Sequence, residues 1–204
     1  MNMTVEDQKR IAKDIMDKVK IIDPYAILAG GAPRDWYFGN LCNDLDIYYY
    51  STGQTISVAK GQLECLFPDH SITNLSERYE NSVVQDEHMS MYNSMKFIRR
   101  VFETTVDGVR VQFIQLSEDR RQFDVVNAMD VSICQCWYNH YKDEIILSRN
   151  FKLTLASKIM FLPNGNNWAD KHPFKMRERF PQFSAGEEDA AVRRAINESL
   201  RRIY

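Results

Sequence analysis

The segment over residues 29–47, AGGAPRDWYFGNLCNDLDI, constrains the fold of this chain more than any other part of the sequence. A short apolar run ends at Gly30 and Gly31, and Pro33 fits the first turn of a short helix, where its missing N–H costs nothing. The chain then returns as a strand that opens with Asp-Leu-Asp at residues 44–46. The segment therefore predicts a strand, a glycine turn, a short helix and a second strand.

Two carboxylates open the second strand. Residues two apart on a strand share a face, so Asp44 and Asp46 lie together while Leu45 and Ile47 point into the core. Two ionised carboxylates repel each other, and a bound divalent cation removes that repulsion. Mg²⁺ is usually held by one or two carboxylates together with substrate phosphates. A glycine turn and a helix start beside such a pair offer close backbone approach to a phosphate, which predicts metal-assisted phosphoryl or nucleotidyl transfer.

Hydrophobic periodicity and turn residues predict the remaining elements. The expected helices cover residues 4–20, 54–66, 149–162 and 186–204, with a turn and short helix over 118–129. Asp107-Gly108 supplies the tight turn of a hairpin between strands 97–106 and 109–116. The order predicts an α+β domain with a mixed sheet, followed by a mostly helical tail.

Composition excludes several other classes of protein. The 204 residues suffice for one compact domain, and no apolar run approaches the roughly 20 residues that a membrane span needs. Four cysteines make no disulfide framework, and no secretory signal opens the chain, so we expect a cytoplasmic protein. Residues 1–139 hold 14 Lys and Arg against 20 Asp and Glu, whereas residues 140–204 hold 12 against 8. Ordinary scatter explains this asymmetry better than a polyanion-binding surface does.

The same segment resembles a known motif. The strings GGAPRDWYFG and DLDI resemble the core motif of the polymerase-β-type nucleotidyltransferase superfamily, and most closely its branch of CCA-adding enzymes and bacterial poly(A) polymerases. Residues 130–134 resemble a stretch of short nucleotidyltransferase-like proteins, many of them phage-encoded. The resemblance implies a polymerase-β-like nucleotidyltransferase core over residues 1–160, a mixed sheet flanked by helices, with a short helical extension over 161–204. For a phage-encoded member, the location would be the host cytoplasm.

The resemblance also implies roles for individual residues. Asp44 and Asp46 would be the catalytic and metal-binding carboxylates. The residues implied to bind the nucleotide are Gly30, Gly31, Arg34, Asp35, Asp130, Lys152 and Lys158. Arg34 could instead pair with a surface acid, and the two lysines could equally belong to a solvated helix face.

A second stretch of the branch, R-R-D-F-T-I-N-A-M, contributes to the nucleotide pocket. Residues 120–129 keep R-R, Phe and N-A-M but place Gln122 where the acid belongs. Residues 130–134 resemble D-F-T-I-N, with Asp130 as the acid. We favour Asp130, because its Val and Ile spacing and the aromatics that follow continue a strand-like core.

The third carboxylate of the superfamily marks a departure. Members often carry it on a later strand in a hairpin like 97–116, where this chain offers Gln112 and Arg110. Glu103 on the partner strand is a possible substitute. A catalytically silent binding or regulatory module is therefore the alternative to an enzyme.

The activity implied is transfer of a nucleoside monophosphate from an NTP to an acceptor hydroxyl, with release of pyrophosphate. The implied cofactor is Mg²⁺, with Mn²⁺ as a substitute. The favoured acceptor is an RNA 3′ end, with a protein hydroxyl as the other candidate. The residues beyond 160 are too few for the long helical regions with which CCA-adding enzymes grip tRNA, so we expect no full tRNA clamp.

Overall fold

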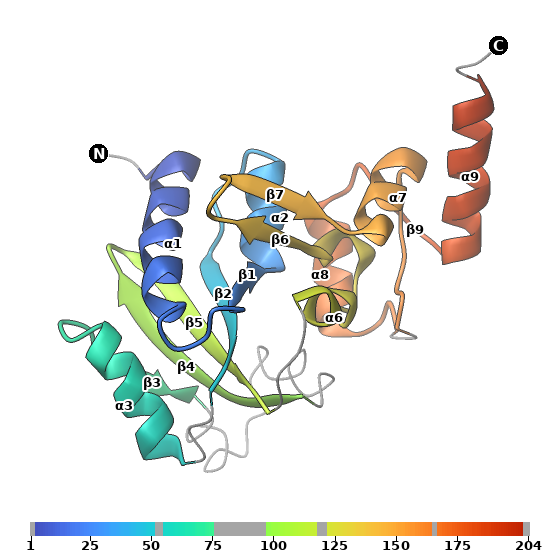
Figure 1. The fold of residues 1–204 in the computed structure, drawn as a ribbon. Coiled ribbons are helices and arrows are strands. Elements are labelled where there is room, and N and C mark those ends of the chain that lie inside the picture. Colours follow the sequence, from blue (N-terminus) through green and yellow to red (C-terminus); the bar gives the residue numbers. More distant parts are fainter. Residues whose placement is uncertain (1–2, 52–54, 76–96, 118–121, 165–166, 202–204) are drawn as a thin grey trace.

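A computed structural model describes residues 3–51, 55–75, 97–117, 122–164 and 167–201 of the chain (Figure 1). Within these residues, seven strands form one mixed sheet in the order β3-β4-β5-β2-β1-β6-β7. The strands are β1 Ile27–Ala29, β2 Asp44–Tyr50, β3 Thr73–Asn74, β4 Ile98–Val106, β5 Val109–Leu116, β6 Cys136–Asn139 and β7 Glu144–Leu147. Strands β2 and β5 run parallel, and the other neighbours pair antiparallel. The α+β class and the mixed sheet are confirmed.

Helices cover both faces of this sheet (Figure 1). The helices are α1 Val5–Val19, α2 Gly31–Tyr37, α3 Ile56–Leu66, α6 Gln122–Asn127, α7 Arg149–Ser157 and α8 Lys171–Arg179. A further helix, α9 Glu188–Arg201, lies beside the sheet and packs against α7. Helix α1 begins as expected with a capping box, in which Thr4 and Asp7 satisfy each other's backbone N–H groups. Within the described residues, no helix is long and apolar enough to cross a bilayer.

The side chains of β2 divide between two hydrophobic clusters, one on each face of the sheet. Leu45 and Ile47 belong to the cluster that α1 and α3 cover. Tyr48 belongs to the cluster that α6, α7 and α8 cover. The predicted alternation is confirmed, because Asp44 and Asp46 share the face of Tyr48 and line a pocket with it.

The hairpin of β4 and β5 also forms where Asp107-Gly108 predicts it. Both turn residues have positive φ, 49° for Asp107 and 80° for Gly108, as a tight hairpin turn requires. The parallel pairing of β5 with β2 then sets Arg110 opposite Asp44 and Gln112 opposite Asp46. Long-range pairing thus brings two hairpin residues beside the acid pair.

Two expectations for the later part of the chain are wrong, and one helix of the expected helical tail was not located. The helix predicted over 149–162 ends at Ser157, because Lys158 adopts a left-handed conformation with φ of 59°. Strand β8, Ile159–Met160, follows and pairs in parallel with β9, Ser184–Ala185. Residues 132–134 form a 3-10 helix instead of continuing a strand, and the strand with its aromatics begins only at Cys136. The tail also holds α8, which periodicity did not reveal.

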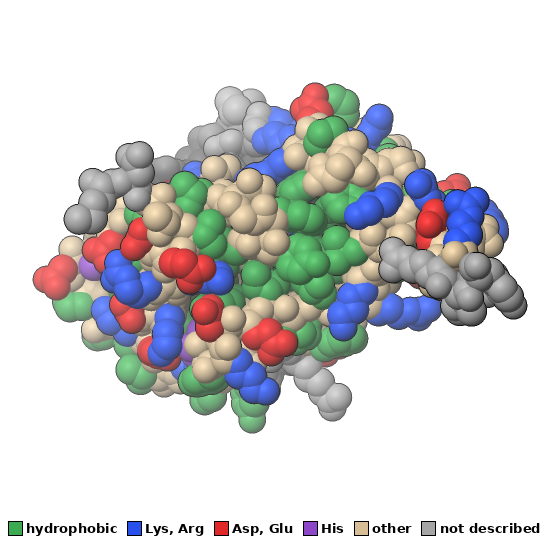
Figure 2. Space-filling view, turned by 90° about the horizontal axis from the view of Figure 1, so that it is seen from above, with side chains coloured by type: hydrophobic (Ala, Val, Ile, Leu, Met, Phe, Trp, Pro, Cys, Tyr) green, Lys and Arg blue, Asp and Glu red, His purple; other side chains and the backbone are tan. Residues whose placement is uncertain are grey.

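Seen from above, hydrophobic side chains gather in the middle of this face of the molecule (Figure 2). Side chains of both charges surround them on one side, and Lys and Arg predominate towards α9 on the other. This distribution follows the charge asymmetry of the sequence, in which residues 140–204 carry the excess of basic residues.

Candidate active site

One pocket collects most of the residues that the sequence singles out. Its lining comes from the turn between β1 and α2, the start of β2, the start of β5, residues 129–134 and α8. The lining residues are Gly30, Gly31, Arg34, Asn43, Asp44, Asp46, Tyr48, Arg110, Gln112, Met129, Asp130, Cys134, Lys171, His172, Lys175, Met176 and Arg179. Six of the nine predicted site residues are among them, and Asp35, Lys152 and Lys158 are not.

Gly30 and Gly31 have different reasons to lack a side chain. Gly30 has φ of 83°, and a Cβ there would lie 3.3 Å from Met129 Cε, so both conformation and space require glycine. A Cβ on Gly31 would meet only Arg34 Nη2, at 3.8 Å. Because Gly31 lines the pocket and its protein neighbours tolerate a Cβ, the space that it leaves is available to a ligand.

The acid pair lies at the opening of β2. Arg110 Nη2 donates to Asp44 Oδ2 over 2.6 Å, and the Asp46 residue is 8% exposed. Among the described residues, no group of three His, Cys, Asp or Glu side chains could hold a metal ion. Two neighbouring carboxylates nevertheless fit Mg²⁺, provided that phosphate and water supply its remaining ligands. The two carboxylates do not suffice for a metal whose ligands all come from the protein.

Glu103 does not substitute for the third carboxylate by joining the acid pair. It lies on β4, opposite Gln112 in register and one strand further from Asp46. Gln112 Nε2 donates to Glu103 Oε2 over 3.2 Å, and Arg110 Nε lies 4.0 Å from the same oxygen. Gln112 therefore separates Glu103 from Asp46, and Glu103 orients the two hairpin side chains.

Arg34 lines the pocket, but its guanidinium binds other side chains of the protein. It is 3% exposed and binds Asp35 through Nε at 2.9 Å and through Nη2 at 2.9 Å. Its Nη1 contacts Cys134 Sγ at 3.1 Å and Met176 Sδ at 3.0 Å. A buried guanidinium needs such partners, because an unpaired buried charge is costly. The structure thus gives Arg34 an internal role in joining α2 to α8.

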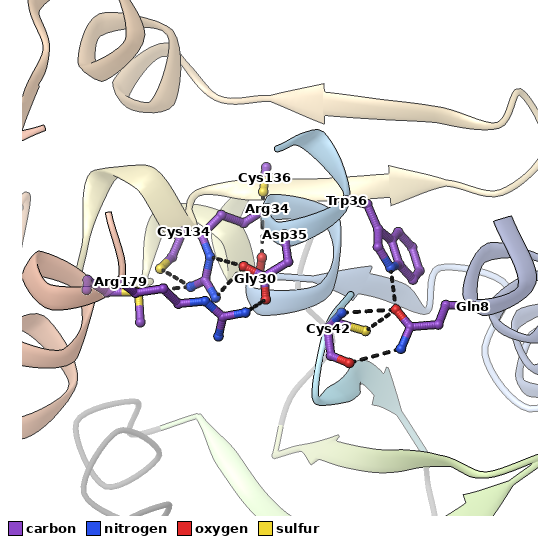
Figure 3. Close-up of polar contacts among 10 residues, drawn as sticks. Gln8, Gly30, Arg34, Asp35, Trp36, Cys42, Cys134, Cys136 and Arg179 are labelled. Atoms are coloured by element: carbon purple, nitrogen blue, oxygen red, sulfur yellow. Dashed lines mark hydrogen bonds and ion pairs between the residues drawn. The ribbon is translucent and has the colours of Figure 1, made fainter. Parts of the chain in front are cut away.

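Asp35 binds Arg34 through Oδ1 and a second arginine through Oδ2. Arg179 Nη2, from the last residue of α8, donates to Asp35 Oδ2 over 2.7 Å (Figure 3). Asp35 is 1% exposed, so its two oxygens serve Arg34 and Arg179. The contacts make Asp35 an anchor for α8.

Asp130 lines the pocket and holds another residue of α8. His172 Nδ1 lies 2.8 Å from Asp130 Oδ2 and 3.0 Å from Oδ1. Burial by itself lowers the pKa of His172, but hydrogen bonds to Asp130 and Cys134 outweigh it and raise that pKa to about 10. The imidazolium is therefore charged near neutral pH. For the competing alignment, Arg120 and Arg121 lie outside the described residues, as does the side chain of Gln122.

The structure does not bring Lys152 or Lys158 into the pocket. Lys152 is exposed on α7. Lys158 ends that helix, and its Nζ lies 5.4 Å from the centre of the Phe183 ring. Both lysines are exposed, as the alternative of a solvated helix face predicts.

A buried glutamine fixes the loop that leads to the acid pair. Gln8 of α1 accepts hydrogen bonds from Trp36 Nε1 and Cys42 N, both at 3.0 Å, and donates to Cys42 O at 2.9 Å (Figure 3). Cys42 lies two residues before Asp44. Helix α1 thereby connects the end of α2 to the start of β2.

Sequence reasoning missed the contribution of α8 to this pocket. Lys171, Lys175 and Arg179 recur every four residues, which places them on one side of a helix. That spacing was the available signal, with Asp170 as N-cap and Pro173 in the first turn. The pocket therefore includes residues from both sides of the expected boundary at residue 160.

Sequence comparisons give no relative. No family model matches the chain, and no curated protein matches it.

Solved structures do resemble it. A tRNA-processing enzyme in its apo form superposes with a TM-score of 0.60 at 14% identity, over 97% of this chain and 48% of that one. The Bacillus stearothermophilus CCA-adding enzyme in complex with CTP gives 0.54 at 16% identity, over 89% and 42%. The Thermotoga maritima CCA-adding enzyme complexed with tRNA gives 0.51 at 14%, over 95% and 47%. The chain spans less than half the length of these proteins. At this identity the likeness concerns the fold, and the chain shares the nucleotidyltransferase fold of the CCA-adding enzymes.

Proposed function

We propose that this chain is a metal-dependent nucleotidyltransferase that moves a nucleoside monophosphate from an NTP to the 3′ hydroxyl of an RNA. The observation that carries the proposal is the pocket itself. It joins the carboxylates of Asp44 and Asp46 to the glycine turn at Gly30 and Gly31, on a fold that CCA-adding enzymes share. Acidic ligands for a metal thus face a turn that a phosphate can approach closely.

The proposed reaction exchanges one phosphorus–oxygen bond for another. The acceptor oxygen forms a bond to the α-phosphorus. The bond between the α-phosphorus and the oxygen that bridges it to the β-phosphorus breaks, so pyrophosphate leaves. The acceptor proton is lost to solvent. Asp44 and Asp46 would hold Mg²⁺ or Mn²⁺, which offsets phosphate charge and lowers the pKa of the attacking hydroxyl. Gly31 leaves room for the phosphates, and Asp130 and Asp35 fix α8 over the pocket.

RNA is the proposed acceptor for two reasons. The structural neighbours include a CCA-adding enzyme complexed with tRNA. Lys171, Lys175 and Arg179 line the pocket, and this placement of cations suits a polyanionic acceptor, whereas the charge asymmetry of the sequence by itself does not argue for one.

A labelling experiment tests substrate and acceptor together. Each α-³²P-labelled NTP is incubated with the protein, Mg²⁺ or Mn²⁺, and either total RNA or total protein. Label in the RNA fraction is expected, and its absence from Asp46→Asn assays would assign the transfer to this pocket. Label in protein alone would replace RNA with a protein hydroxyl as the acceptor.

A second candidate function is a silent module that binds a nucleotide without transferring it. Two observations favour it, namely the neutral Gln112 beside Asp46 and the ion pair of Arg110 with Asp44. Isothermal calorimetry with Mg-ATP distinguishes the two. Equal binding by the wild type and Asp46→Asn, without pyrophosphate release from any NTP, would favour the silent module.

A further inference from the structure

Helix α8 presents a row of cations to the pocket. Lys171, Lys175 and Arg179 lie four residues apart, and all three line the pocket. The neighbouring row, His172, Met176 and Phe180, turns inward, where Met176 and Phe180 are buried. One side of α8 therefore faces the same space as the acid pair and the glycine turn.

Buried contacts fix this helix in place. Arg179 binds Asp35 at 2.7 Å, and His172 binds Asp130 at 2.8 Å. Arg34 contributes a third attachment, through Met176 Sδ at 3.0 Å and the Phe180 ring, whose centre lies 5.2 Å from Arg34 Cζ. Figure 3 shows Arg179 reaching from α8 to the carboxylate of Asp35 beside Arg34. Because α8 is held at three points, its lysines have a defined position over the pocket.

The cations of the pocket divide into two groups. Arg34 and Arg179 share Asp35, Arg110 binds Asp44, and His172 binds Asp130, so these four serve contacts inside the protein. Lys171 and Lys175 also interact within the protein, but they are exposed on the helix. A lysine ammonium sits on a flexible four-carbon stem, so it can exchange a protein contact for a phosphate oxygen. The two lysines are thus the cations best placed to meet an incoming anion.

We propose that Lys171 and Lys175 bind the β- and γ-phosphates of the NTP, which makes α8 the polyphosphate-binding wall of the pocket. This inference rests on the proposed function. It assigns the phosphate contact to α8, which the motif does not include, and not to the basic residues that the resemblance implied to bind the nucleotide, Arg34, Lys152 and Lys158. The carboxylates of Asp35 and Asp130 then act as positioning residues, because they hold α8 where its lysines reach the phosphates.

Calorimetric titration with inorganic triphosphate and with Mg-ATP tests this wall on the full chain. The variant Lys171→Ala/Lys175→Ala is compared with Arg177→Ala, which removes one exposed charge from the same helix outside the pocket lining. A charge-assisted hydrogen bond to phosphate changes affinity by about tenfold, so the double variant should bind both ligands at least about tenfold more weakly. Arg177→Ala should bind within about twofold of the wild type, as expected of a surface charge.

The charge-retaining variant Lys171→Arg/Lys175→Arg separates charge from folding, and it should keep most of the affinity for triphosphate. Wild-type affinity in the double alanine variant would overturn the inference. If that variant also transferred nucleotide while Asp46→Asn did not, the proposed function would stand without the wall. Failure of the wild type to bind either ligand would overturn both the wall and the proposed function.

Discussion

Arg110 Nη2 lies 2.6 Å from Asp44 Oδ2, and the two residues are direct register partners on β5 and β2. The guanidinium occupies a coordination direction of a carboxylate that the proposed metal would need. A divalent cation therefore has to displace Arg110 or share Asp44 with it. The pair is partly exposed, with 38% of the Arg110 side chain accessible, so solvent weakens the attraction.

Removal of this guanidinium should raise the affinity for metal. Arg110→Gln frees Asp44 while keeping a polar side chain, and an exposed pair of this kind contributes up to about 1 kcal/mol, or about fivefold in affinity. Mn²⁺ binding followed by electron paramagnetic resonance, without nucleotide, measures the change. Arg177→Gln serves as the charge-matched control. Weaker Mn²⁺ binding by Arg110→Gln would show that Arg110 supports the metal site instead of competing for it.

Restoring an acid beside Asp46 should make the metal site stronger and the metal-free fold weaker. Gln112→Glu adds a carboxylate between Asp46 and Glu103, the residues that flank Gln112 in register. Three neighbouring carboxylates repel one another, and a divalent cation offsets that repulsion. Thermal melting should show a lower Tm than wild type in EDTA and a larger rise on addition of Mg²⁺. An equal rise for both proteins would count against a metal at this end of β2.

Loss of the Asp35 charge should destabilise the fold. Asp35→Asn leaves Arg34 buried without its carboxylate and removes the ion pair with Arg179. Breaking a buried charge pair on one side costs about 3–5 kcal/mol of unfolding free energy. Urea denaturation measures this loss, and Asp14→Asn, an exposed acid of α1, provides the control. A loss below about 1 kcal/mol would contradict the anchoring role of Asp35.

His172 should make stability fall as pH rises. Its pKa is about 10 in the folded chain against an ordinary 6.5, so the folded state holds the proton more tightly. The stabilisation is complete below about pH 6.5, declines between pH 6.5 and 10, and is lost above pH 10. Urea midpoints measured across this range should fall more steeply for wild type than for His172→Gln. Parallel profiles would mean that the imidazolium does not stabilise the pocket.

The local parts of the site could be predicted from the sequence because local rules determine them. The turn at Gly30, the alternation of Asp44 and Asp46 with core residues, and the hairpin turn at Asp107 each depend on neighbours along the chain. The α+β class followed from the order of these elements.

The rest depends on contacts between residues far apart in the sequence. Arg34 looked like a nucleotide-binding residue because nothing nearby in the sequence shows that α8 covers it. Arg179 and Asp35 are 144 residues apart, and no local pattern announces their ion pair. The end of α7 could not be predicted from the sequence for another reason. Lys158 adopts positive φ, but the residue there is not the glycine or asparagine that usually marks such a turn.

Pyrophosphate release measured with Mg²⁺, NTP and RNA tests the central claim most directly, namely that Asp44 and Asp46 support nucleotidyl transfer. Wild type and Asp14→Asn should release pyrophosphate at similar rates, because Asp14 is an exposed acid on α1. Asp46→Asn should lose at least about 100-fold in rate, since it removes one of the two proposed metal ligands from the pocket. Equal rates for wild type and Asp46→Asn, or no release by any of the three proteins with any NTP, would contradict the claim.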